Sequence, residues 1–149
     1  MTTSSSDTPS TETTSVTTSI PAEALNTGDV VGFDTRMIAL SGQPMQVAVA
    51  DSSELRQQGL MFVEDLGDLD GMLFIFDSER LGAFWMKNTL IPLDIAFFAD
   101  SGEMVGTMTM VPCEVDPCIH YDIGLPYRYA LETPAGALGG VAEGSRLEF

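Results

Sequence analysis

The residues best suited to chemistry lie in one apolar segment, which holds the only tryptophan and the only lysine of the chain. Residues 84–98 read FWMKNTLIPLDIAFF, and their polar or amphipathic members include Trp85, Lys87, Asn88 and Asp94. A lysine among large apolar side chains must be solvated, paired with an acid or used to hold a ligand. We therefore expect these four residues to form a ligand-binding site at the mouth of an apolar pocket, with Trp85 as a wall on which a ligand stacks.

Lys87 has the most specific chemistry of the four. It would act as the cation for a carboxylate ligand, or as a base if burial lowers its pKa. Pro92 interrupts the strand ladder, and the resulting turn is expected to bring Asp94 back towards Lys87. The alternative is a structural ion pair between Lys87 and Asp94, in which Asn88 binds the backbone of the turn.

Both cysteines lie in one short loop, VPCEVDPC, at residues 111–118. Their C-x4-C spacing around a proline favours a disulfide between Cys113 and Cys118 in an exported protein. Closing so short a loop stabilises the fold by only about 2 kcal/mol in the chain-entropy model, so the bond would mainly shape the loop. The alternatives are free or redox-active thiols, or a zinc site that adds His120 and Asp116. Zinc is less favoured because structural zinc sites usually have closer cysteines and more histidines.

Two further clusters are weaker candidates. Residues 64–71 read EDLGDLDG, an acidic loop that offers carboxylates to a hard cation such as calcium. Its spacing does not match an EF-hand, and a solvated loop is the simpler interpretation. The tyrosines Tyr121, Tyr127 and Tyr129 with Arg128 could line a groove for sugars or amino acids, and we include Tyr121 and Arg128 among the ligand-binding residues. The alternative is that they are half-buried strand residues.

The chain lacks the signatures of the common enzyme classes. It has no G-x-S-x-G motif, no phosphate-binding P-loop and no Rossmann glycine pattern. A histidine-dependent triad would rest wholly on His120, the only histidine, and is not favoured. The sequence leaves open whether the protein is an enzyme, prefers a binding role and predicts no cofactor.

The charge of the chain narrows its partners. Its formal net charge is −16, and residues 30–149 alone carry eighteen acidic and six basic residues. Such a surface repels phosphate backbones and anionic lipids, so we expect no nucleic-acid partner. Solubility is the simplest role of this charge.

The N-terminal segment differs from the rest in composition. Fourteen of the first nineteen residues are serine or threonine, and such a tract cannot bury enough apolar surface to fold. We predict a disordered stalk over residues 1–29 and one β-rich domain over residues 30–149. Ser/Thr-rich stalks are typical of secreted or lipid-anchored bacterial proteins, so we expect an extracytoplasmic protein whose natural chain has a signal sequence upstream. No apolar run is long enough for a transmembrane helix.

Short strands must position the candidate residues. A capping-box pattern, with Asp51 as N-cap and Glu54 three residues later, predicts a short helix that ends before Gly59. Residues 134–140 read as a single helical turn. The many short strands predict a mainly β protein, a compact β-sandwich or jelly-roll-like barrel with one or two short helices. The expected strands are residues 37–40, 45–50, 72–76, 83–87, 93–99, 103–111, 127–133 and 146–149.

Four motifs occur in an order that resembles a known family. They are QQGLM at residues 57–61, DGMLFIF at 70–76, FWMKNTLIPLDI at 84–95 and PC…DPC at 112–118. On these motifs the chain resembles the domain of unknown function 192 family over about residues 36–149. The resemblance implies a compact, jelly-roll-like β-sandwich and a protein that is often exported, and it implies no activity. Many members have arginine where this chain has Val63.

Together these observations predict an extracytoplasmic module that binds a small molecule, a glycan or a partner protein around Trp85, Lys87, Asn88 and Asp94. One alternative is a small hydrolase that uses Asp94 as general base beside Lys87. The other is a structural or assembly component without a ligand site.

Overall fold

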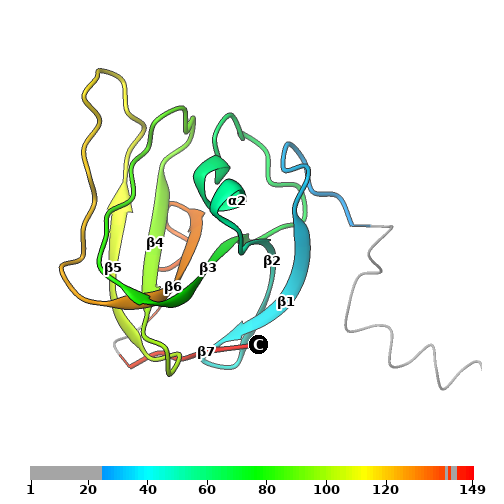
Figure 1. The fold of residues 1–149 in the computed structure, drawn as a ribbon. Helices are drawn as coiled ribbons and strands as arrows, with labels where there is room; N and C mark the ends of the chain where they lie inside the picture. Colours follow the sequence, from blue (N-terminus) through cyan, green and yellow to red (C-terminus); the bar gives the residue numbers. More distant parts are fainter. Residues whose placement is uncertain (1–24, 140, 142–143) are drawn as a thin grey trace, which may run out of the picture.

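The computed structural model describes residues 25–139, 141 and 144–149 (Figure 1). The predicted stalk therefore lies mostly outside the described residues. Its last five residues contact the domain: the Asn26 backbone N–H donates to the Asp68 carboxylate, and the Asp29 backbone N–H donates to the Asp65 carbonyl. The boundary at residue 29 stays a prediction.

The mainly β prediction is confirmed, and its barrel-like form is one seven-stranded sheet curled into a half-barrel. The sheet order is β5-β4-β6-β3-β2-β1-β7. The strands are β1 (Asp34–Leu40), β2 (Gln43–Ala50), β3 (Gly71–Arg80), β4 (Leu93–Phe98), β5 (Met104–Met110), β6 (Tyr127–Pro134) and β7 (Leu147–Glu148).

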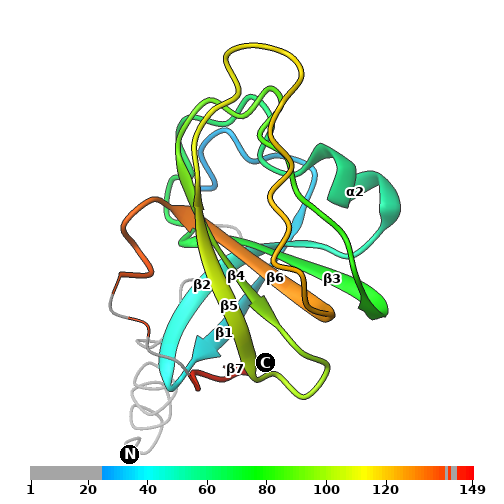
Figure 2. The same ribbon diagram turned by 90° about the vertical axis from the view of Figure 1, so that its left-hand side faces the viewer.

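The curl brings the two edge strands of the sheet together at one end. Glu103, before β5, forms an antiparallel bridge with Arg146, before β7, and Figure 2 shows β7 beside the lower end of β5. The Leu147 N–H donates to the Gly102 carbonyl at 2.8 Å. Gly102 has a φ of +94°, and a Cβ there would lie 2.7 Å from the Leu147 carbonyl oxygen, so the contact requires glycine.

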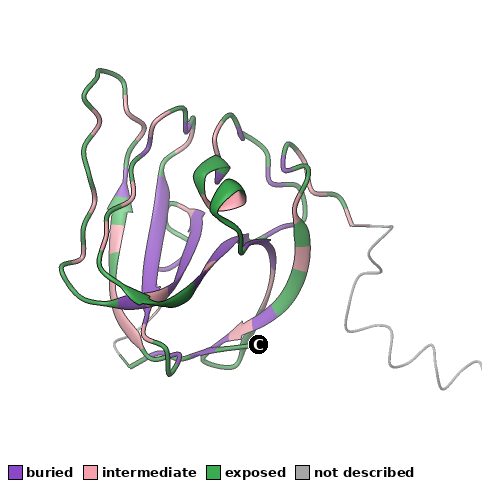
Figure 3. Cartoon of the chain, viewed as in Figure 1, coloured by how far each residue is buried: buried purple, intermediate pink, exposed green. Residues whose placement is uncertain are grey.

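Side chains alternate between two apolar clusters on opposite faces of the sheet. Along β3, Met72 and Phe74 belong to the larger cluster, whereas Leu73 belongs to the smaller one. The three central strands β3, β4 and β6 are almost wholly buried where they meet, while the helix and most loops are exposed (Figure 3). The core therefore fixes which face each strand residue occupies.

One helix, α2 (Ser53–Gln58), follows β2 and lies over the open side of the curled sheet (Figure 1). Its N-cap is Ser52, whose Oγ accepts from the Leu55 N–H at 3.2 Å, and not Asp51 as the sequence predicted. Gly59 ends the helix with a φ of +47°, as expected for the residue after a helix. No helix in the described ranges is long and apolar enough to cross a membrane.

The strand predicted over residues 83–87 is wrong. Only Phe84 is extended and paired there, through backbone hydrogen bonds of 3.0 and 2.8 Å with Tyr121. The chain turns soon afterwards because Asn88 adopts a left-handed φ of +58°, which asparagine tolerates better than most residues. The predicted helical turn at 134–140 is a run of tight turns in its described part, such as Ala137 N–H to Pro134 carbonyl.

Candidate functional site

A cavity of about 350 Å³ lies between α2, β3 and residues 83–89. Its volume is at the lower end of the range of small-molecule sites. Trp85 and Lys87, which the sequence placed in a site, both line it, and so do Arg56, Arg80 and Glu132. The cavity thus combines aromatic, cationic and acidic side chains.

Glu132 of β6 lines this cavity among apolar strand neighbours. Its neighbours on the adjacent strands are Met72 and Ile95, and both are fully buried. Glu132 is only 4% exposed, and no described residue donates a hydrogen bond to its carboxyl group. Every fully enclosed side-chain oxygen of the described residues has a hydrogen-bond partner. The carboxyl group of Glu132 has none, so it is not fully enclosed and opens into the cavity that it lines.

Burial raises the pKa of Glu132 from 4.5 to about 8. The cause is desolvation, which penalises the charged carboxylate more than the neutral acid. At neutral pH this acid is therefore mostly protonated, and it can both donate and accept a hydrogen bond.

Cations gather at the same cavity. Arg56, Arg80 and Lys87 are three of only six basic residues in the chain. The Arg56 and Arg80 guanidinium carbons each lie 4.8 Å from the centre of the Phe76 ring. Among the described residues, neither arginine has a carboxylate within ion-pair distance. Arg56 is held by a 2.7 Å hydrogen bond to the Ile75 carbonyl, so its position is fixed without neutralising its charge.

Packed rings form the apolar wall. Phe84 meets Phe74 edge to face at 5.2 Å and Phe76 at 6.5 Å. Trp85 is half-exposed beside them, with His120 at 6.2 Å and the Lys87 ammonium 5.8 Å from its ring. Lys87 and Trp85 therefore do lie together, as the sequence predicted.

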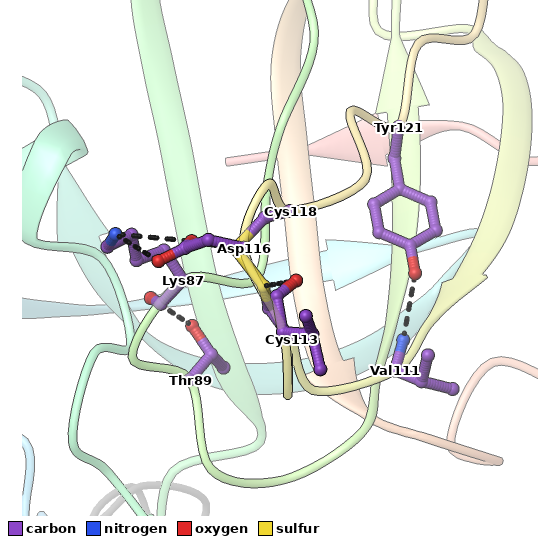
Figure 4. The surroundings of a disulfide bond; sticks show 8 residues. Lys87, Thr89, Val111, Cys113, Asp116, Cys118 and Tyr121 are labelled. Atoms are coloured by element: carbon purple, nitrogen blue, oxygen red, sulfur yellow. Dashed lines mark hydrogen bonds and ion pairs between the residues drawn. A yellow bond between two sulfur atoms is a disulfide. The ribbon is translucent and has the colours of Figure 1, made fainter.

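The acid that pairs with Lys87 is Asp116, at 3.4 Å, and not Asp94 (Figure 4). Asp116 lies within the loop closed by the predicted Cys113–Cys118 disulfide, which is present with an S–S distance of 2.02 Å. Disulfide sulfurs are not thiolates, so in this state the two cysteines do not offer the zinc ligands of the alternative hypothesis. The bond is typical of proteins from oxidising compartments.

Asp94 lies on the other face of the sheet. Its β4 neighbours Leu93 and Ile95 face the cavity cluster, so Asp94 faces the smaller one. It accepts hydrogen bonds of 2.8 Å from the Thr109 hydroxyl and from the Gly136 N–H. The expected turn back towards Lys87 is wrong because β4 begins at Leu93 and fixes Asp94 within its ladder.

The remaining predicted ligand residues are not in this cavity. Arg128 donates to the Phe76 carbonyl at 2.9 Å and pairs with Asp100 at 2.7 Å. Tyr121 lines a separate hollow of about 100 Å³ next to the disulfide, and its hydroxyl accepts from the Val111 N–H (Figure 4). The backbone carbonyl of Asn88 accepts from the Phe62 N–H at 2.7 Å and so joins two loops.

The acidic loop at 64–71 uses several of its carboxylates within the fold. Asp65 accepts from the Gly67 N–H at 2.8 Å, and Asp70 accepts from the Gln46 N–H at 2.8 Å. Val63 at the start of this loop is 4% exposed and packs in the larger cluster. These contacts give the loop a structural role.

The sequence did not predict a place in the site for Arg56, Arg80 or Glu132. The available signal was Glu132 itself, which lies on the same face as Ala130 in a strand whose other residues are mostly apolar. An acid at such a position must either be neutral or meet a partner. The arginines gave no signal of their own, because only the fold brings α2 and the end of β3 to the same cavity.

The comparisons with known proteins agree with this fold. A protein from Sinorhizobium meliloti 1021 described as a candidate transcription regulator is 35% identical, with a TM-score of 0.68 over 80% of this chain and 96% of that chain. A protein of unknown function from Novosphingobium aromaticivorans DSM 12444 is 27% identical, with a TM-score of 0.72 over 86% of this chain and 94% of that chain. Among curated proteins, none matches.

The family assignment follows from a match along most of the chain. The model of DUF192, a family described as an uncharacterized ACR, matches residues 36–149. This range includes the cavity, the disulfide loop and all seven strands except the first two residues of β1. The chain therefore belongs to the DUF192 family.

Proposed function

We propose that this protein is a binding module for a small organic anion, which it holds in the cavity lined by Arg56, Arg80, Lys87 and Trp85. The observation that carries the proposal is the concentration of three of the six basic residues of a strongly acidic chain around one cavity. Cations that serve only solubility would be spread over the surface.

The two arginines support an anionic ligand most directly. Both lie beside the Phe76 ring and lack a carboxylate partner among the described residues, so no described acid neutralises their charges. A carboxylate or similar anion would supply the missing negative charge and accept charge-assisted hydrogen bonds. The rings of Phe84 and Trp85 would pack against the body of the ligand.

The other functions considered have less support. A glycan or protein partner would need an extended surface, whereas this site is concave and charged. A hydrolase that uses Asp94 with Lys87 lacks a geometric basis, since Asp94 faces the other side of the sheet. The S. meliloti protein is described as a candidate transcription regulator. Binding of this chain to DNA is disfavoured by its net charge of −16.

The cellular setting belongs to the same proposal. The disulfide fits an oxidising compartment, and the Ser/Thr-rich N-terminal segment fits a stalk that keeps the domain away from a cell surface. We place the protein outside the cytoplasm, secreted, periplasmic or lipid-anchored.

The test is ligand binding measured through Trp85, the only tryptophan and a lining residue of the cavity. Benzoate, 4-methylbenzoate and hexanoate are titrated into the wild type and into Arg56→Gln and Arg80→Gln. We expect each substitution to weaken binding about 10- to 100-fold, because a hydrogen bond to a charged group contributes about 1.5–3 kcal/mol.

Arg36→Gln is the matched control. It removes the same charge from β1, where Arg36 lies over the Phe149 ring and does not line the cavity. We expect this variant to bind as the wild type does. Equal losses in all three variants, or no saturable binding of any anion by the wild type, would refute the proposal.

A further inference from the structure

We propose that the ligand carries an ammonium group as well as an anionic group, at opposite ends of an apolar body, and that the ammonium binds Glu132 while the anion binds Arg56 and Arg80. The ligand class is an amino acid of the ω-amino type or a similar amine-bearing carboxylate. This inference rests on the proposed function and adds the chemistry of the second end of the ligand.

Glu132 is isolated from hydrogen-bond donors. The residue is 4% exposed, has fully buried apolar neighbours on both adjacent strands and has no hydrogen-bond donor among the described residues. A glutamate of purely structural use would be paired or would point to solvent, because an unpaired buried carboxyl group is destabilising. Its opening into a cavity indicates that the missing partner comes from outside the protein.

An ammonium group is the partner that fits Glu132 best. A divalent metal ion is not favoured, because calcium takes six to eight oxygen ligands and, among the described residues, Glu132 is the only acid that lines the cavity. A second carboxylate at this end would face a group of its own charge whenever Glu132 ionises. An ammonium group instead supplies both the positive charge and the donors that the carboxylate lacks.

Acidic and basic side chains occupy opposite ends of the cavity. Glu132 is almost fully buried, whereas Arg80 is exposed and Arg56 and Lys87 are half-exposed. The acid thus marks the inner end and the cations mark the mouth, with Phe74, Phe84 and Trp85 also lining the space. A simple amine would be repelled at the mouth, and a simple anion would leave Glu132 without a partner. A ligand with both groups satisfies both ends.

Ammonium binding must also displace a proton. The raised pKa of Glu132 keeps the acid mostly protonated at neutral pH, and a bound ammonium would favour the ionised form. Binding should therefore release about one proton per ligand near pH 7, an effect that the anionic end alone does not produce.

The experiment compares probes that differ only in the ammonium group. Calorimetric titrations at pH 7 use 4-(aminomethyl)benzoate against 4-methylbenzoate, and 6-aminohexanoate against hexanoate, in two buffers with different ionisation enthalpies. We expect the wild type to bind each amine-bearing probe at least 10-fold tighter than its matched carboxylate. We also expect the two buffers to report release of nearly one proton for the amine-bearing probes only.

Glu132→Gln tests the assigned residue. This variant should lose the preference for the amine-bearing probe and the proton release, while it keeps the binding of 4-methylbenzoate. Equal affinity of the wild type for both members of each pair, or binding without proton release, would overturn this inference and leave the proposed function intact. Absence of binding by every carboxylate would overturn both. The proton measurement needs only the wild type, so the inference stays testable if the variant does not fold.

Discussion

Replacing Glu132 by glutamine should change how stability depends on pH, in a direction that the structure fixes. Burial raises the pKa of this carboxyl group from 4.5 to about 8. Below pH 4.5 the acid is protonated in both the folded and the unfolded chain, so it causes no pH dependence. Between these two values the unfolded chain loses the proton and the folded chain keeps it, so the free energy of unfolding falls as the pH rises.

The size of this effect follows from the two pKa values. Each pH unit in the window costs up to about 1.4 kcal/mol, so moving the pKa from 4.5 to about 8 corresponds to about 5 kcal/mol in total. This is a large part of the roughly 5–15 kcal/mol that stabilises a typical domain. Glu132→Gln cannot ionise, so it should lack this decline and should be more stable than the wild type above pH 8.

The assay is urea unfolding from pH 5 to pH 9, followed by Trp85 fluorescence and by far-ultraviolet circular dichroism. A high salt concentration limits the repulsion among the other acids. Any pH dependence that the wild type and the variant share cancels in the difference between them. The same pH slope in both proteins would refute the reasoning, because it would mean that Glu132 is ionised in the folded domain.

Three other predictions concern residues around the site. Replacing Cys113 and Cys118 by serine together should lower the free energy of unfolding by about 2 kcal/mol, the value for so short a closed loop; urea unfolding checks this, and an unchanged midpoint would contradict it. Asp94→Ala should destabilise the domain by about 3 kcal/mol or more, because it leaves the Gly136 and Thr109 donors without their acceptor. The folded variant should still bind carboxylates as the wild type does. A loss of binding without a loss of stability would contradict this and would show that Asp94 belongs to the site. Lys87→Met should lower the free energy of unfolding by less than about 1 kcal/mol, because the ion pair of Lys87 with Asp116 is exposed. A double-mutant cycle with Asp116→Asn measures the coupling between the two residues. A coupling well above about 1 kcal/mol would contradict a weak surface pair.

Much of the fold could be predicted because strand alternation is a local signal. The pattern of Met72 and Phe74 against Leu73 gives both the strand and its two buried faces. The disulfide was also predictable, since Cys113 and Cys118 are close in sequence. The strand predicted at 83–87 was wrong because only Phe84 pairs with another backbone segment there, and a left-handed Asn88 then turns the chain.

The site was only partly predictable because its charges come from distant parts of the chain. Trp85 and Lys87 stood out by composition, and both line the cavity. The acid that pairs with Lys87 lies 29 residues further on, in the disulfide loop, whereas Asp94 was chosen for being near in sequence. Glu132 looked like one more strand residue. Its importance lies in the absence of a hydrogen-bond donor beside its carboxyl group, and a sequence pattern does not show which donors the fold leaves out.

Among the described strands, only β2 and β3 run parallel to each other. The chain between them must therefore cross over the sheet, and α2 is part of that crossover. Such connections are right-handed in nearly all proteins, because the twist of the strands favours that hand. Chirality therefore decides on which face the helix lies, and hence on which face a cavity can be enclosed, before any lining side chain is chosen. Relatives that keep this crossover should keep a cavity in this place even where its arginines and its glutamate are replaced, so ligand chemistry can diverge within the family while the location of the site does not.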